Sequence, residues 1–168
     1  MDYDEFINSL VDNKWIKEDK NNICLADVHS IILPCEINKL CSLYSILRNP
    51  EDTVWFYSLD DYIGSSKSEF EWNYFEKNSL ECAINESQRK DILNFWGNHI
   101  PFGASVVNGY SYIAFRSTDK AIVIGNEPEY EDSATPVAQS IERFFDLCIS
   151  TIYKKDLNSP ISYFLGLN

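Results

Sequence analysis

Apolar residues recur every three or four positions in two parts of the N-terminal half, which is the spacing of a buried helix face. The first helix is expected to start after Asp2, a capping residue, and to end near Asn13. The second is expected to start at Leu33-Pro34, because proline pre-sets the first helical turn, and to stop before Pro50. Its apolar stripe comprises Ile37, Leu40, Cys41, Tyr44 and Leu47.

Two further helices are expected in the C-terminal half. One is capped by Asn85 or Ser87 and ends at Gly97, since glycine adopts the left-handed conformation at little cost. The other opens at Thr135-Pro136, where proline again favours a helix start. Its apolar face comprises Val137, Ile141, Phe144, Cys148 and Ile152.

Between these helices the sequence has the alternation and the aromatic and β-branched content of strands. Residues 53–59 predict one strand. The segments on either side of Asn108-Gly109 predict a hairpin, because that pair favours a type I′ turn. Another strand is expected at 121–124. The alternating segment 68–76 fits either a half-buried strand or a short helix.

The order of these elements predicts a single α+β domain over residues 1–168. In this fold a central antiparallel meander is flanked by the N-terminal helices and covered by the C-terminal helix. The length is that of one ordinary domain, and 45% hydrophobic residues suffice for a buried core.

The chain is strongly acidic, because 26 aspartates and glutamates against 14 lysines and arginines give a formal net charge of −12. Such a field repels phosphate backbones and anionic lipid, so nucleic acid and membrane surfaces are poor candidate partners. A basic protein or a cation is a better candidate, although acidity also serves solubility.

Residues 1–10 have neither the basic start nor the apolar centre of a secretory signal, and no apolar run reaches the ~18 residues of a membrane span. We therefore expect a cytoplasmic protein. Its cysteines are expected to be reduced core residues, since their number is odd and their spacing matches no metal motif. They are Cys24, Cys35, Cys41, Cys82 and Cys148. A monomer and a weak homo-oligomer both stay open.

No motif marks a catalytic or cofactor site. The glycines match neither a P-loop nor a dinucleotide fingerprint, and no serine or cysteine stands in a known nucleophile motif. His29 and His99 lack neighbouring ligands, so each is expected to be structural. The acidic segment 127–132 could hold calcium loosely but lacks the ligand order of an EF-hand. We expect no metal and no cofactor.

Four segments stand out together: the Leu33-Pro34 helix start with its stripe, IPFGASVVNGYSYIAF at 100–115, AIVIG at 121–125, and VAQSIERFFDLC at 137–148 after an acidic stretch. In their order and spacing these segments resemble the SMI1/KNR4 family, also called the SUKH superfamily. The resemblance covers about Ile31 to Ile149. It implies a non-catalytic α+β module. Bacterial members are immunity proteins that bind the toxin made beside them, often a nuclease, and fungal members regulate cell-wall glucan synthesis.

The resemblance and the charge together lead us to expect an immunity protein that binds a cognate basic toxin. Acidic side chains beside aromatic ones are the expected contacts, because carboxylates pair with arginine or lysine and aromatic rings anchor. They are Asp60, Asp61, Tyr62, Glu69, Glu71, Glu127, Glu129, Tyr130, Glu131 and Asp132. Two alternatives remain: a regulatory scaffold of the glucan-synthesis type, and a small hydrolase that pairs Asp or Glu with His99.

Overall fold

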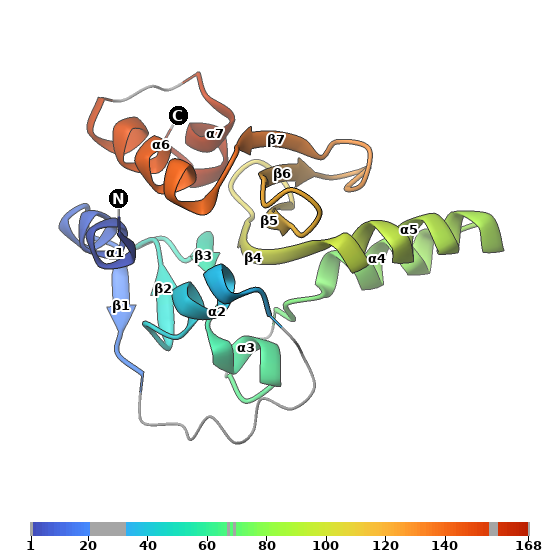
Figure 1. The fold of residues 1–168 in the computed structure, drawn as a ribbon, viewed down its shortest axis with the longest axis horizontal. Coiled ribbons are helices and arrows are strands. Elements are labelled where there is room, and N and C mark those ends of the chain that lie inside the picture. Colours follow the sequence, from blue (N-terminus) through green and yellow to red (C-terminus); the bar gives the residue numbers. More distant parts are fainter. Residues whose placement is uncertain (1, 21–32, 67, 69, 155–157, 168) are drawn as a thin grey trace.

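The computed structural model describes residues 2–20, 33–66, 68, 70–154 and 158–167, and it is built on one seven-stranded antiparallel sheet (Figure 1). The strands follow one another across the sheet in chain order. They are β1 (Ile16–Glu18), β2 (Ile46–Arg48), β3 (Val54–Phe56), β4 (His99–Ser105), β5 (Ser111–Arg116), β6 (Ile122–Asn126) and β7 (Thr135–Ala138). The helices of the described residues are α1 (Tyr3–Asp12), α2 (Cys35–Cys41), α3 (Leu59–Ile63), α4 (Tyr74–Cys82), α5 (Glu86–Asn98), α6 (Ile141–Lys154) and α7 (Pro160–Leu165).

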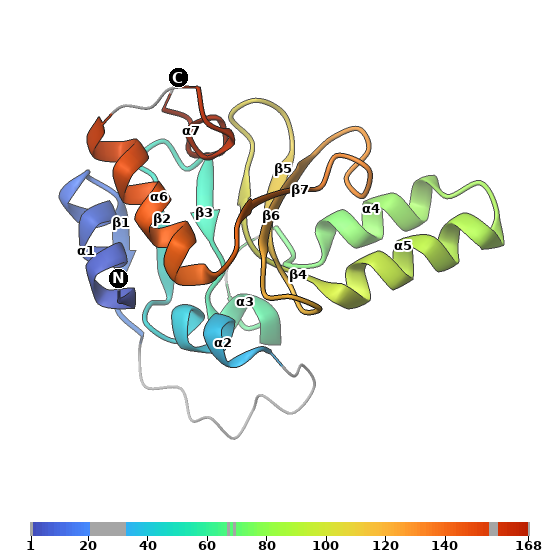
Figure 2. The ribbon, with the colours of Figure 1, turned by 45° about the horizontal axis from the view of Figure 1, so that its top comes forward.

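Strand β5 lies inside the sheet, and its residues from Ser111 to Phe115 are all buried. It pairs with β4 and β6, so that Tyr112 lies opposite Ala104 on one side and Gly125 on the other. Because the side chains of a strand alternate between two faces, a strand buried along its length must be covered on both. Helices accordingly lie on both sides of the sheet (Figure 2).

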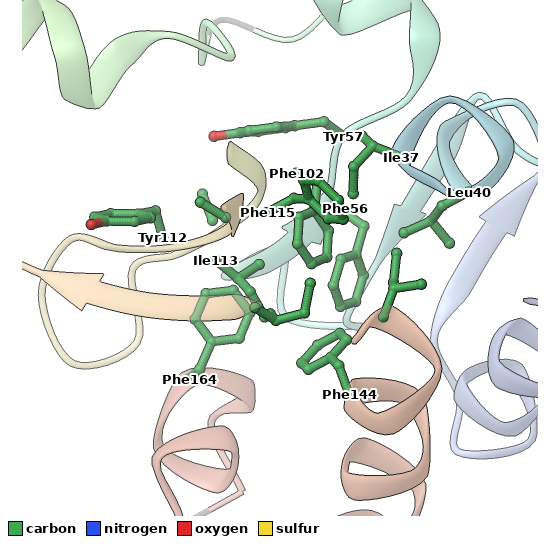
Figure 3. Close-up of a cluster of buried hydrophobic side chains, with 14 of the residues drawn as sticks. Ile37, Leu40, Phe56, Tyr57, Phe102, Tyr112, Ile113, Phe115, Phe144 and Phe164 are labelled. Carbon is green, nitrogen blue, oxygen red and sulfur yellow. The ribbon is translucent and has the colours of Figure 1, made fainter. Parts of the chain in front are cut away.

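One face of the sheet is covered by α1, α6 and α7. Phe6 of α1 stacks on Phe145 of α6, with ring centroids 4.2 Å apart. The ring centroid of Phe144, the residue before Phe145, lies 6.5 Å from that of Phe56 and 5.8 Å from that of Phe102 in the sheet. Figure 3 shows Phe144 and Phe164 pointing from α6 and α7 into the same cluster. Buried aromatic rings remove the largest apolar areas from water, so this cluster is a main source of the domain's stability.

Helices α4 and α5 form an antiparallel pair, the α4–α5 hairpin, which extends from the sheet as an arm (Figures 1 and 2). Its base is attached through Tyr112 of β5, whose ring centroid lies 4.9 Å from Trp96 of α5 and 5.3 Å from Phe75 of α4. Ile84, at the turn between the two helices, is 87% exposed. The arm is therefore packed at its base and open to solvent at its tip.

The α+β class and the antiparallel meander are confirmed, and the meander has more strands than the sequence predicts. Asp2 caps α1, since its carboxylate accepts a hydrogen bond from the Glu5 backbone N–H at 2.8 Å. Asn85 caps α5 in the same way and accepts from the Gln88 backbone N–H at 2.9 Å.

The prediction that the second helix carries its apolar stripe as far as Leu47 is wrong, because α2 ends at Cys41. Tyr44 and Leu47 are buried, as the apolar stripe predicts, but Leu47 lies on β2. This strand pairs with β1 on one side and β3 on the other. Hydrogen bonds between strands therefore replace the expected helical ones at residues 46–48. The spacing of the apolar residues alone does not distinguish a longer helix from a helix followed by a buried strand.

The helix start predicted at Thr135-Pro136 is also wrong. These residues belong to β7, and α6 begins at Ile141. Proline is tolerated here because β7 is the edge strand of the sheet. Gly97 lies within α5, which ends at Asn98, instead of terminating the helix. Asn108 lacks the positive φ that a type I′ turn needs, so a longer loop joins β4 to β5.

The strand predicted at 53–59 ends at Phe56, and the residues from Leu59 to Ile63 form the short helix α3. Asp61 makes its capping box, accepting a hydrogen bond from the Ser58 backbone N–H at 2.7 Å, and Gly64 ends the helix with a φ of 72°. Of the two alternatives for segment 68–76, the helix is correct from Tyr74, where α4 begins.

The cysteines match the core prediction only in part. Cys41 and Cys148 are buried free thiols, whereas Cys35 and Cys82 are free but exposed. Burial raises the pKa of the Cys41 and Cys148 thiols, which keeps both protonated and unreactive. Cys24 and His29 lie outside the described residues.

Truncating Phe144 to alanine is expected to lower the free energy of unfolding by about 3–5 kcal/mol, because it leaves a cavity among aromatic rings that cannot collapse fully. Tyr153→Ala, on the exposed face of the same helix, is the control and is expected to change stability by no more than about 0.5 kcal/mol. Equilibrium urea unfolding measures both. Equal losses for the two variants would contradict the assignment of this face to the core.

Candidate functional site

A groove lies between the α4–α5 hairpin and the loop of residues 127–134 that joins β6 to β7. Figures 1 and 2 both place this loop beside the hairpin. The groove has a volume of about 700 Å³ and is open to solvent. Four carboxylates line it, those of Asp91, Glu129, Glu131 and Asp132, and we call it the acidic groove.

The lining of the acidic groove mixes charge with apolar surface. Asp91 stands on α5, and the other three carboxylates come from the loop. Apolar surface comes from Ile92, Phe95 and Pro128. A patch that combines apolar contacts with a charged and polar border has the composition of a protein–protein interface.

The loop is held against the arm by a hydrogen bond between side chains far apart in sequence. The indole Nε1–H of Trp96 donates to the Glu131 carboxylate at 2.6 Å. Trp96 is buried, so its N–H depends on this carboxylate for a partner. Bonds between a neutral donor and a charged acceptor are stronger than neutral pairs, and this one fixes the middle of the loop at the base of α5.

A second attachment is the ring of Tyr130, which is buried against Phe75 of α4 with ring centroids 5.1 Å apart. The Tyr130 backbone carbonyl accepts a hydrogen bond from the Tyr112 hydroxyl at 2.8 Å. The Tyr112 phenol lies directly over Gly125, where any side chain would collide with it. The loop is therefore anchored to the core through Tyr130 and Glu131, whereas Glu129 and Asp132 are exposed.

The carboxylates of the acidic groove lack basic partners. No ion pair within the described part of the chain involves Asp91, Glu129, Glu131 or Asp132. Like charges held near one another repel, and a basic partner would relieve that repulsion. The groove thus presents negative charge that no basic side chain among the described residues neutralises.

His99 is a structural residue, as the sequence predicts. Its ring stacks on Phe95 with centroids 3.9 Å apart, and its Nδ1 lies 2.8 Å from the Phe95 carbonyl oxygen. Burial lowers the pKa of His99, so the ring is neutral near pH 7 and Nδ1 carries the proton donated to that carbonyl. These contacts join the end of α5 to the start of β4.

Three of the predicted contact residues, Glu129, Glu131 and Asp132, come together in the acidic groove. Glu127 does not join them, because its carboxylate accepts from the Tyr110 backbone N–H at 3.0 Å on the β4–β5 loop. The expectation that Tyr130 is an exposed anchor is wrong, since its ring is 4% exposed and belongs to the core.

The predicted contacts outside the loop lie elsewhere. Asp60, Asp61 and Tyr62 belong to α3, and none of them lines the groove. Tyr62 is buried, and its hydroxyl donates to the Pro101 carbonyl at 2.5 Å, so the expectation of a surface anchor is wrong here too. Glu71 pairs with Lys77, and Glu69 lies outside the described residues.

Sequence reasoning missed Asp91 and Phe95 as groove residues and Trp96 as the support of the loop. The available signal was the helical spacing of Ile92, Phe95 and Trp96, which predicts burial but not which neighbour covers each ring. The Trp96–Glu131 bond spans 35 positions, and no local pattern reports it.

No protein-family model, no curated protein and no solved structure matches this chain. Among the described residues, no three or more His, Cys, Asp or Glu side chains are arranged to hold a metal ion. Within the same ranges, no helix has both the length and the apolar character needed to cross a membrane.

Replacing Glu131 by alanine is expected to lower the free energy of unfolding by about 1–3 kcal/mol, because the buried Trp96 N–H loses its acceptor. It should also speed amide hydrogen exchange in residues 127–134. Glu131→Gln keeps a carbonyl oxygen at the same position and is expected to lose less than half as much. Urea unfolding and hydrogen exchange measure the pair; identical behaviour of the two variants would show that the bond does not hold the loop.

Proposed function

We propose that this protein is a non-catalytic immunity protein whose acidic groove binds a basic toxin domain and covers its substrate-binding face. The observation that supports the proposal best is the set of carboxylates on α5 and the β6–β7 loop that have no basic partner among the described residues. The immunity role itself comes from the resemblance of about residues 31–149 to the SMI1/KNR4 family.

The chemistry of the groove suits the surface of a nucleic-acid-cleaving toxin. A protein that binds phosphate backbones presents lysine and arginine side chains, and these pair with carboxylates. Asp91, Glu129 and Asp132 can supply that pairing, and Phe95 and Pro128 supply apolar contact. The groove would then occupy the positive face that the toxin needs for its substrate.

The net charge of −12 assists the encounter. Long-range attraction between an acidic and a basic protein raises association above the neutral rate of about 10⁵–10⁶ M⁻¹s⁻¹. A fast encounter is valuable for a protein that must neutralise a lethal enzyme before it acts.

The attachment of the loop by Trp96 and Tyr130 limits the entropy lost on binding. A surface loop without such anchors would have to be ordered when the partner binds, at a cost in affinity. Here the backbone that carries Glu129 and Glu131 is already fixed by core contacts. The groove is accordingly preformed rather than assembled by the partner.

The double charge reversal Glu129→Lys with Asp132→Lys is expected to weaken binding of the toxin by about 10- to 100-fold, mainly through slower association. The toxin is first isolated by affinity capture with the tagged protein from its native cells, and its rates are then measured by surface plasmon resonance. The control is Asp12→Lys with Glu51→Lys, which changes the net charge equally at exposed positions outside the groove.

A cell-survival assay connects this binding to immunity. Expression of the captured partner alone should kill the host, co-expression of the wild-type protein should protect it, and the groove variant should protect less than the control variant. Equal weakening by both double variants would show that only total charge matters, and a partner that is harmless when expressed alone would contradict the immunity role.

A further inference from the structure

A second, smaller cavity lies at the base of the α4–α5 hairpin. Its volume is about 200 Å³, and Trp96 and Gly97 of α5 line it. These residues lie on a different face of α5 from Asp91 and Asn98 of the acidic groove, because successive helical residues are about 100° apart. We call it the tryptophan pocket, since Trp72 and Trp96 both contribute to its walls.

Both tryptophans are held in place by other side chains. The Trp72 ring packs on Tyr62 with centroids 5.4 Å apart, and Tyr62 is itself fixed by its hydrogen bond to the Pro101 carbonyl. Trp96 is fixed by its bond to Glu131. The aromatic surface of the pocket therefore does not need to rearrange in order to receive a ligand.

Glu76 gives the tryptophan pocket its charge. This half-buried carboxylate of α4 lines the pocket, and within the described residues it makes neither a hydrogen bond nor an ion pair through its side chain. Its neighbour Lys77 pairs with Glu71 instead. A partly desolvated carboxylate without a partner is costly, so the site is chemically suited to a cation.

We infer that the tryptophan pocket binds the guanidinium group of an arginine side chain presented by a protein partner, independently of the acidic groove. A guanidinium is planar, stacks on indole rings and forms paired hydrogen bonds with a carboxylate. Tryptophan is the strongest aromatic partner for a cation. The volume is below the roughly 300–1,000 Å³ of pockets that hold drug-sized ligands, and so fits one side chain.

No lysine or arginine is among the described residues that line the pocket. Burial lowers the pKa of His99, so its ring adds no positive charge near pH 7. Burial raises the pKa of the Glu76 carboxyl by more than the charge of nearby Lys77 lowers it, so burial dominates the environment of this carboxylate. Leu33 and Pro101 contribute apolar surface. An arginine would supply the missing positive charge and be shielded from water by the rings.

The test is a titration of the whole protein with N-acetyl-L-arginine amide, followed through the indole N–H signals of its tryptophans by NMR. The signals of Trp72 and Trp96 should shift and those of Trp15 and Trp55 should not, because the latter lie outside the pocket. N-acetyl-L-citrulline amide, which has the same shape without the charge, should bind at least about tenfold more weakly. If free L-arginine binds more tightly than the capped form, the pocket is a site for the free amino acid. That result would overturn the inference that the arginine belongs to a protein partner.

Two variants assign the binding to its residues. Glu76→Gln should weaken binding of the arginine probe by at least about tenfold. It should not lower the stability of the protein, because within the described residues it removes a charge that has no partner. Glu81→Gln makes the same change at an exposed position of α4 outside the pocket and should leave binding unchanged. Equal affinity for the arginine and citrulline probes, or equal binding by the two variants, would overturn the inference. Neither outcome depends on whether the acidic groove binds a toxin.

Discussion

The hydrogen bond from the Trp96 indole to the Glu131 carboxylate is the contact on which the functional surface depends. It joins the arm of the molecule to the acidic loop, and the buried ring of Tyr130 against Phe75 supports it. Without these two attachments the loop would be an ordinary solvated turn with four acidic residues. With them, Glu129, Glu131 and Asp132 line the same groove as Asp91 of α5. The same indole also forms a wall of the tryptophan pocket, so one residue supports both candidate binding sites.

The aromatic core and the candidate binding surfaces occupy different parts of the fold. The face of the sheet under α1, α6 and α7 buries aromatic rings in close contact, and its energy comes from apolar area removed from water. The side that carries the arm keeps charges that have no ion-pair partner within the described ranges, including Glu76 and the carboxylates of the acidic groove. Such charge adds repulsion and partial desolvation, which reduce stability. In the function proposed above, a basic partner would turn the same groups into favourable contacts.

The sequence predicted the features that depend on nearby residues. Asp2 and Asn85 are helix caps set by side chains within a few positions. The pairing of the strands on either side of Gly109 was predicted too, although the turn between them is not the expected type I′. Prediction from the sequence failed where the structure of a segment depends on residues far away in the chain. Residues 46–48 and 135–138 are strands because they pair with neighbouring strands, and Tyr62 and Tyr130 are buried because other elements cover them. The acidic loop could be predicted as a candidate site from its composition, but Asp91, Glu76 and the tryptophans could not, since their roles arise only when α4, α5 and the β6–β7 loop meet.

The most direct test of the account is a hydrogen–deuterium exchange footprint of the protein bound to its captured partner. The account predicts slower exchange in residues 86–99 and 127–134 of the complex than in the free protein, with no change in α1 and α6. Protection confined to α1 and α6, with unchanged exchange in the acidic loop and the arm, would contradict the assignment of the acidic groove as the binding surface.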